Sequence, residues 1–244
     1  MQRRATSAYL AELIGTFLLV LFIALVVTVN SEAGIGYTDV AVVALVHAFA
    51  LMAIVATIGG TSGAHVNPAV TIALAALRKI APVDALVYIV MQLAGAVLAV
   101  LVVKLLVQDG SADAVNFGAP AVGQNFLEGK PAAGFLAELI GTFALMWAIM
   151  GVAVNPKAAK EWAPLVIGAT LGIGVMALAP MTGASFNPAR AFGPALVSWE
   201  FGDGATFVFV YIAGPIVGAL AAAFAYQAAI IGDGPSMRPV DKLG

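Results

Sequence analysis

The sequence contains little charge and no cysteine. Of its 244 residues, 10% are Asp, Glu, Lys or Arg, whereas soluble domains usually have about 25%. The lack of cysteine excludes disulfides, thiolate chemistry and cysteine metal sites. With two histidines and no evident nucleophile–base or phosphate-loop pattern, we expect no enzyme, no metal and no cofactor. A net charge of −2 argues against nucleic acid as a partner.

Hydrophobic residues make up 62% of the chain. Left in water, this much apolar surface would be costly, at roughly 25 cal/mol per Å². About 20 apolar residues cross the roughly 30 Å hydrocarbon core of a bilayer. The chain has apolar runs of near this length, and we predict an all-α integral membrane protein with a lipid bilayer around it. The predicted spans are 8–29, 40–60, 83–107, 132–154, 163–180 and 206–231.

Two further apolar stretches, 68–77 and 188–198, are too short to cross the membrane. Ten helical residues at about 1.5 Å each cover only about 15 Å. Each stretch follows a cluster of turn-forming residues, at 59–63 and 180–183. A half-length helix entered through such a loop is typical of a re-entrant segment, which enters and leaves the bilayer on one side. We therefore predict two re-entrant half-helices.

The chain contains an internal repeat. The segment 11–17 (AELIGTF) recurs letter for letter at 137–143. The segment 62–70 (SGAHVNPAV) is matched by 182–190 (TGASFNPAR) at a similar offset. Segments that recur in the same order, at nearly the same distance along the chain, indicate a duplication.

This duplication predicts an inverted arrangement. Each half contains three spans, an odd number, so the second half must enter from the opposite side of the membrane. The half-helices would then dip in from opposite sides and meet near the midplane, as in many transport proteins. We predict a single transmembrane domain over 1–244 with repeats at about 8–107 and 132–231.

The same three residues, Asn-Pro-Ala, open both half-helices. Asparagine is a favoured N-cap residue, and proline is favoured at the first helical position because its missing N–H costs nothing there. The triplets therefore predict the two helix starts at the inner tips of the loops, with the asparagine amides available to passing molecules. The residues are Asn67, Pro68 and Ala69 in the first half and Asn187, Pro188 and Ala189 in the second.

These features together resemble the aquaporin or major intrinsic protein family, over about residues 5–232. The resemblance rests on the paired triplets, the Ala-Glu-x-x-Gly-Thr start of each half and the six spans. It implies a passive channel for water and small neutral solutes that excludes protons and ions, assembled as a homotetramer. Exclusion by helix ends and an arginine is the mechanism generally given for aquaporin-type pores.

Arg190 directly follows the second triplet. A charge inside a membrane segment is costly unless it meets water or partners, so it either snorkels to the interface or lines a polar site. The resemblance places it in an outer selectivity filter, together with His47, Val175 and Ala184 by the family's spacing. For His47, a hydrogen-bonded histidine packed between helices is the alternative.

This filter differs from the strictly water-selective pattern, which has Phe at the first position and His at the second. It also differs from glycerol facilitators, which have aromatics there and Asp after the arginine, where this chain has Ala191. A histidine with small aliphatic partners is similar to plant tonoplast intrinsic proteins and implies a wider opening. Ammonia, hydrogen peroxide and urea therefore join water as candidate permeants. A glycerol-type facilitator or a secondary transporter remains the alternative.

Glu12 and Glu138 are carboxylates inside predicted spans, which by default suggest ion or proton coupling. Because they recur at equivalent sites, we expect them instead to accept hydrogen bonds from N–H groups of the re-entrant loops. The resemblance gives His65 a role in ordering the first loop, with contact to permeants as the alternative.

Basic residues indicate the orientation. They gather in the two terminal segments and in the loops after the second and fourth spans, which with six spans share one side. By the positive-inside rule both termini are cytoplasmic, and the compact termini suit a prokaryotic inner membrane. The residues are Arg3, Arg4, Arg78, Lys79, Lys157, Lys160, Arg238 and Lys242.

Overall fold

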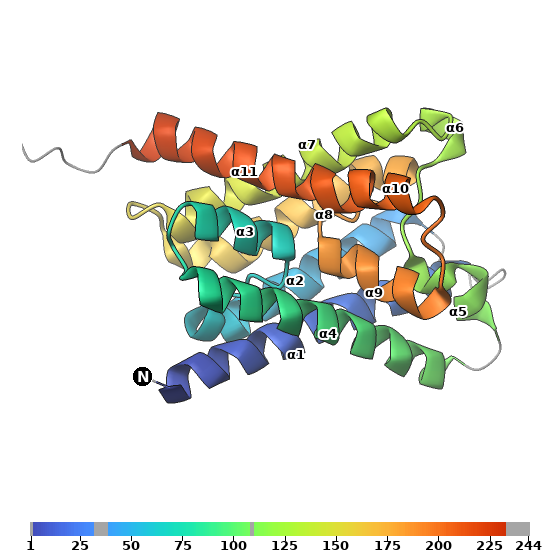
Figure 1. The fold of residues 1–244 in the computed structure, drawn as a ribbon, viewed down its shortest axis with the longest axis horizontal. Coiled ribbons are helices and arrows are strands. Elements are labelled where there is room, and N and C mark those ends of the chain that lie inside the picture. The colour runs from blue at the N-terminus through green and yellow to red at the C-terminus, as the bar shows by residue number, and fades with distance from the viewer. Residues whose placement is uncertain (1, 32–38, 108–109, 233–244) are drawn as a thin grey trace, which may run out of the picture.

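The computed structural model of the chain describes residues 2–31, 39–107 and 110–232 as a bundle of long helices (Figure 1). Six helical stretches within these residues are long and apolar enough to cross a membrane. Each overlaps one predicted span, and at most of the twelve ends the observed helix is a few residues longer than predicted. They are Thr6–Ser31, Val40–Ser62, Pro82–Leu106, Pro131–Val154, Lys160–Thr182 and Gly204–Ile231.

The first half contains four helices and is followed by a connection of short turns. Its helices are α1 (Gln2–Ser31), α2 (Val40–Ser62), α3 (Pro68–Ala76) and α4 (Pro82–Leu106). The connection contains α5 (Ser111–Ala114), the 3₁₀ turn η1 (Asn116–Gly118) and α6 (Gln124–Leu127).

The second half repeats this order, and its first and last spans include short π-helical segments. Its first span is α7 (Pro131–Ile149), which continues as the π-helix η2 (Met150–Val154). The 3₁₀ turn η3 (Lys160–Trp162) leads into α8 (Ala163–Thr182), and α9 (Pro188–Ser198) follows. The last span joins α10 (Gly204–Phe207), the π-helix η4 (Val208–Ala213), α11 (Gly214–Tyr226) and the π-helix η5 (Gln227–Ile231).

Matching glycines pack the helices of each half. A Cβ atom on Gly95 of α4 would overlap the carbonyl oxygen of Leu13 on α1. A Cβ atom on Gly218 of α11 would overlap the carbonyl oxygen of Leu139 on α7 in the same way. Small residues allow such close approach of helices inside a membrane. The two halves thus share one packing scheme, while the exact repeat bounds stay a prediction.

The half-helices α3 and α9 occupy the middle of the bundle and approach one another end to end (Figure 1). They contain 9 and 11 residues, and their bounds differ from the predicted 68–77 and 188–198 by at most one residue. Two N-termini therefore meet inside the protein rather than at its surface.

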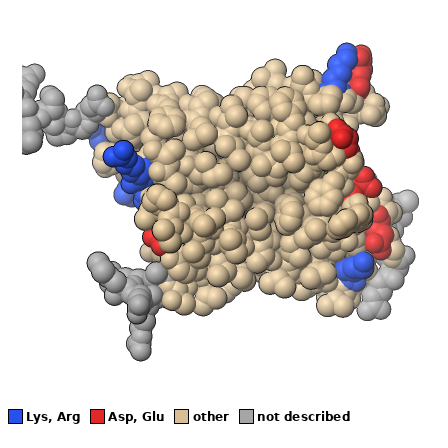
Figure 2. Space-filling view, viewed as in Figure 1, with Lys and Arg blue, Asp and Glu red and all other residues tan. Residues whose placement is uncertain are grey.

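Charged residues occupy the two ends of the molecule, and the long sides are almost free of them on the face shown in Figure 2. Lys and Arg gather at the end that carries the N-terminus, whereas most visible Asp and Glu lie at the opposite end. Arg238 and Lys242, used above to predict the orientation, lie outside the described residues. This distribution suits a protein whose long sides face lipid.

We predict that Gly95→Ala destabilises the protein. The added methyl group would push α4 away from the backbone of α1, and overpacking of this kind costs about 1–3 kcal/mol. Thermal unfolding in detergent should show a lower midpoint. Gly60→Ala is the matched control, because a Cβ atom there would meet nothing within 4 Å. Equal midpoints for the two variants would contradict the packing scheme.

Candidate functional site

The two re-entrant loops share an unusual backbone. Each has a left-handed glycine, a left-handed alanine and a left-handed residue directly before the asparagine. For residues other than glycine, such φ angles cost on the order of 1–3 kcal/mol each and persist only where the surroundings enforce them. The residues are Gly63, Ala64 and Val66 in the first loop and Gly183, Ala184 and Phe186 in the second.

Glu12 holds the first loop. Its Oε1 accepts hydrogen bonds from the Ser62 hydroxyl (2.7 Å) and the His65 backbone N–H (3.0 Å). Its Oε2 accepts from the Val66 backbone N–H (2.7 Å) and the Gln92 side-chain amide (2.8 Å). Because the Glu12 side chain is fully buried, these donors replace the water that the carboxylate lacks.

Glu138 holds the second loop in the same manner. It is fully buried and accepts hydrogen bonds from the Thr182 hydroxyl (2.7 Å) and the backbone N–H groups of Ser185 (2.9 Å) and Phe186 (2.7 Å). Each bond matches one made by Glu12 at the equivalent position. The structure therefore places both glutamates against loop N–H groups.

The repeated AELIGTF segment also provides space for the loops. A Cβ atom on Gly15 would lie 2.8 Å from the Val66 side chain. A Cβ atom on Gly141 would overlap the Phe186 ring. The sequence predicted a loop-binding role for the glutamate of this segment and a close helix contact for Gly141, but not that the glycine makes room for the loop, although its recurrence was a usable signal.

The asparagines cap the half-helices as predicted for N-cap residues. The Oδ1 atom of Asn67 accepts a hydrogen bond from the Ala69 N–H at 2.9 Å. The Oδ1 atom of Asn187 accepts from the Ala189 N–H at 2.9 Å and from the Arg190 N–H at 3.4 Å. Pro68 and Pro188 follow at the first helical positions.

The side-chain amides of the asparagines also join the two halves. Asn67 Nδ2 donates to the Phe186 carbonyl and Asn187 Nδ2 donates to the Val66 carbonyl, both at 2.8 Å. Each carbonyl belongs to the residue preceding the other asparagine. Since an amide nitrogen carries two hydrogens, each asparagine retains a second donor. This cross-bonding was not evident in the sequence.

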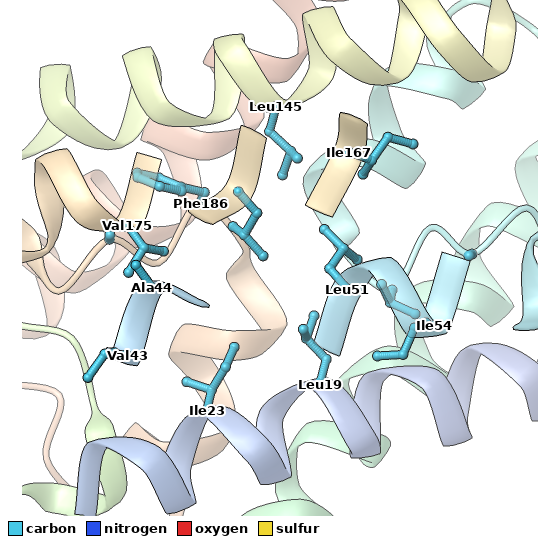
Figure 3. Close-up of a cluster of buried hydrophobic side chains, with 14 of the residues drawn as sticks. Leu19, Ile23, Val43, Ala44, Leu51, Ile54, Leu145, Ile167, Val175 and Phe186 are labelled. Carbon is cyan, nitrogen blue, oxygen red and sulfur yellow. The ribbon is translucent and has the colours of Figure 1, made fainter. Parts of the chain in front are cut away.

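A cavity of about 670 Å³ runs past the asparagines and is lined by both halves. Its lining includes His47 and Arg190, and also Lys79 and Lys160 from the loops at the end of the bundle that carries the N-terminus. Its wall is largely aliphatic. Four of the aliphatic side chains that line it, one each from α1, α2, α7 and α8, are labelled in Figure 3, namely Ile23, Leu51, Leu145 and Ile167.

His47 lines this cavity and has one hydrogen-bond acceptor without a partner in the described part of the chain. Its Nδ1 lies 2.8 Å from the Val43 carbonyl oxygen. Because a carbonyl only accepts, Nδ1 carries the hydrogen, and in the neutral ring Nε2 is an acceptor. Nε2 is buried and has no hydrogen-bond partner among the described residues. His47 therefore combines a packed ring with one unused acceptor.

Arg190 lies in the first turn of α9 and is only 3% exposed. Its Nη1 donates to the Gly118 carbonyl at 2.8 Å. Its Nε is buried without a partner in the described part of the chain. The role of Gly118 was not evident in the sequence, since no pattern in the connection between the halves indicates that its backbone reaches the arginine.

Val175 and Ala184 are buried, at 1% and 0% exposure, and do not line the cavity. They belong to one hydrophobic cluster with Ala44 and Phe186, part of which Figure 3 shows. Of the four predicted filter residues, the cavity lining therefore contains His47 and Arg190. The other two lie within the surrounding packing.

His65 is half-buried, and it lines the cavity and belongs to the first loop. Besides its backbone bond to Glu12, its Nδ1 lies 3.2 Å from the Thr71 hydroxyl. Its ring packs edge-on against Tyr88, with centroids 5.2 Å apart. Both alternatives, ordering of the loop and contact with permeants, fit this position.

The architecture and the paired half-helices define a membrane channel, and the chain belongs to the major intrinsic protein family. The family model, described as "Major intrinsic protein", matches residues 2–226.

Individual relatives come from archaea and plants. The chain is 38% identical over 236 residues to the probable aquaporin AqpM of Archaeoglobus fulgidus, covering 90% of this chain and 95% of that protein. It is 38% identical to aquaporin NIP1-1 of Zea mays, covering 89% and 73%. It is 41% identical to the probable aquaporin TIP3-2 of Arabidopsis thaliana, covering 78% and 67%.

A solved structure has the same fold. The aquaglyceroporin from Plasmodium falciparum superposes with a TM-score of 0.80, covering 93% of this chain and 97% of that chain. At 22% sequence identity, this likeness concerns the fold alone.

We predict that Glu138→Gln weakens the second loop. A glutamine presents one amide nitrogen where the carboxylate has an oxygen, so one loop donor loses its acceptor, at a cost of about 1–3 kcal/mol. Both the unfolding midpoint in detergent and the water permeability of proteoliposomes should fall. Glu200→Gln at an exposed position is the control. Unchanged permeability in Glu138→Gln would show that the loop does not need the carboxylate.

Proposed function

We propose that this channel conducts water and small neutral solutes, including ammonia, hydrogen peroxide and urea, and excludes protons and ions. The observation that carries the proposal is the cavity that joins His47 and Arg190 to the two asparagines. Such a passage combines unused hydrogen-bond donors and acceptors with an aliphatic wall, which suits molecules that cross without binding tightly.

Ion exclusion follows from the charges along this passage. The guanidinium of Arg190 is a full positive charge at the cavity wall. The N-termini of α3 and α9 add roughly half a positive charge each near the asparagines. Near the asparagines, cations meet this field without a free carboxylate, because Glu12 and Glu138 are engaged by the loops. Glu161 also lines the cavity, but it lies away from the asparagines in η3, next to Lys160 in the chain. The same field orients a passing water oxygen toward the asparagine amides.

The permeant range follows from the filter. His47 supplies an acceptor through Nε2, and Arg190 supplies a donor through Nε. A molecule that both donates and accepts, such as water, ammonia or urea, satisfies both groups. Val175 and Ala184 lie in the packing around the cavity rather than on its wall. Larger aromatic side chains at these positions would push into the passage, so we include solutes larger than water.

A glycerol-type facilitator is the second candidate. A wide opening would admit glycerol, but the residues do not match the glycerol-facilitator pattern, since Val175 and Ala184 are not aromatic and the residue after the arginine is Ala191. A secondary transporter is less well supported, because it needs coupling groups and both intramembrane glutamates already hold loops.

We further propose that the chain works as a homotetramer in a prokaryotic inner membrane, with both termini in the cytoplasm. The tetramer is proposed from the family. The orientation is supported by the basic residues at the end of the bundle that carries the N-terminus (Figure 2).

Stopped-flow measurements on proteoliposomes test the channel. Water, ammonia, hydrogen peroxide, urea and glycerol should be compared, and the fluxes of permeant molecules should show low activation energy and no saturation. Arg190→Ala should increase the permeability for urea relative to water and weaken cation exclusion, because a donor and a charge are lost from the passage. A saturable flux with a high activation energy would instead indicate a carrier.

His47→Phe tests the assignment of the filter. We expect the larger ring to narrow the passage beside Arg190, so that urea permeability falls by a larger factor than water permeability. The ratio of the two permeabilities is the measurement. Equal losses for both solutes would count against a filter at this position.

A further inference from the structure

The connection between the halves contains a left-handed turn at η1. Three consecutive residues, Asn116, Phe117 and Gly118, have φ angles of 49°, 53° and 79°. The turn is closed by hydrogen bonds from the Gly118 N–H to the Val115 carbonyl (2.8 Å) and from the Ala119 N–H to the Asn116 carbonyl (2.9 Å). Asparagine and glycine tolerate this conformation, but phenylalanine rarely adopts it. Something outside the turn must therefore hold Phe117.

The turn places the Gly118 carbonyl next to Arg190 of the proposed filter. The Gly118 oxygen accepts the Arg190 Nη1 hydrogen bond at 2.8 Å. Since Nε has no partner among the described residues, this bond fixes the guanidinium from one side and leaves Nε as an unused donor. The position of Arg190 thus depends on the position of a backbone carbonyl far away in sequence.

Phe117 anchors the turn. Its side chain is 1% exposed and lies in a buried cluster formed with residues of α1, α4 and α5 and with Ala189, the neighbour of Arg190 in the chain. The Lys104 ammonium at the end of α4 lies over the ring, 5.8 Å from its centroid. Burial and the cation favour this one placement of the ring.

The connection is also attached at its far end. The Gly123 N–H donates to the Met181 carbonyl at 2.7 Å. Pro120 packs so closely against Gly183 that a Cβ atom there would lie 3.0 Å from the Pro120 Cα. The segment 117–123 is therefore held against the first half by Phe117, against the second re-entrant loop by Pro120 and against the end of α8 by Gly123.

We propose that Phe117 is a positioning residue for the selectivity filter, which sets the orientation of the Arg190 guanidinium through the Gly118 carbonyl and so determines which solutes pass. This inference rests on the proposed function of Arg190. Phe117 itself does not line the cavity. Its effect on selectivity is therefore indirect, and the proposal assigns this effect to the arginine.

The test is a double-mutant cycle in proteoliposomes. Phe117→Ala, Arg190→Ala and the double variant are compared for the ratio of urea to water permeability. We expect Phe117→Ala to raise this ratio by about threefold in the parent protein, the size typical of coupled residues, and to leave it unchanged in the Arg190→Ala background. Phe126→Ala is the matched control, since that ring is 65% exposed in the same connection.

The outcomes separate this inference from the proposed function. If Arg190→Ala does not alter the ratio, the proposed filter fails. If Arg190→Ala alters it and Phe117→Ala does not, only the positioning role fails. A general loosening of the fold would instead move the ratio equally in both backgrounds, which would also overturn the inference.

Two less disruptive substitutions test the proposal if the Phe117→Ala variant does not fold. Phe117→Leu keeps an apolar side chain without the ring, and Lys104→Met removes the cation above it. Both should shift the ratio in the same direction by a smaller factor, and Lys104→Arg should restore the parent value. Parent-like ratios for both Phe117→Leu and Lys104→Met would contradict the proposal.

Discussion

Backbone N–H groups inside a bilayer need acceptors, and in this protein two buried carboxylates supply them. Glu12 and Glu138 each bind a hydroxyl and two successive loop N–H groups. Without these acceptors the left-handed loops would have unpaired donors in a medium that offers no water. The half-helices, their caps and the residues at the cavity all depend on where these loops are held.

The two halves share this scaffold and differ in the residues that face the cavity. Position 70 in the first half is Val70, whereas the equivalent position in the second half is Arg190. His65 likewise corresponds to Ser185. The repeated residues hold the loops, and the differing residues place a positive charge beside the second asparagine and an aliphatic side chain beside the first. A duplicated fold can thus contain an asymmetric passage.

The sequence predicted the features that depend on local physics. The length of the apolar runs predicted the membrane spans. The Asn-Pro pairs predicted the starts of α3 and α9, because capping preferences act within a few residues. The sequence did not indicate the Gly118 carbonyl beside Arg190 or the bonds between each asparagine and the opposite loop. Those contacts join segments about 70 to 120 residues apart, and no local pattern indicates them.

The bonds between the asparagines and the opposite loops have a consequence for biogenesis. When the first half enters the membrane, Glu12 and Gln92 are already present, but the partners of the Asn67 amide and the Val66 carbonyl lie in the second half. The Asn67 amide and the Val66 carbonyl therefore lack these partners until residues 186 and 187 are inserted. These bonds can therefore form only after both halves are in place, and their formation joins the two halves at the centre of the bundle.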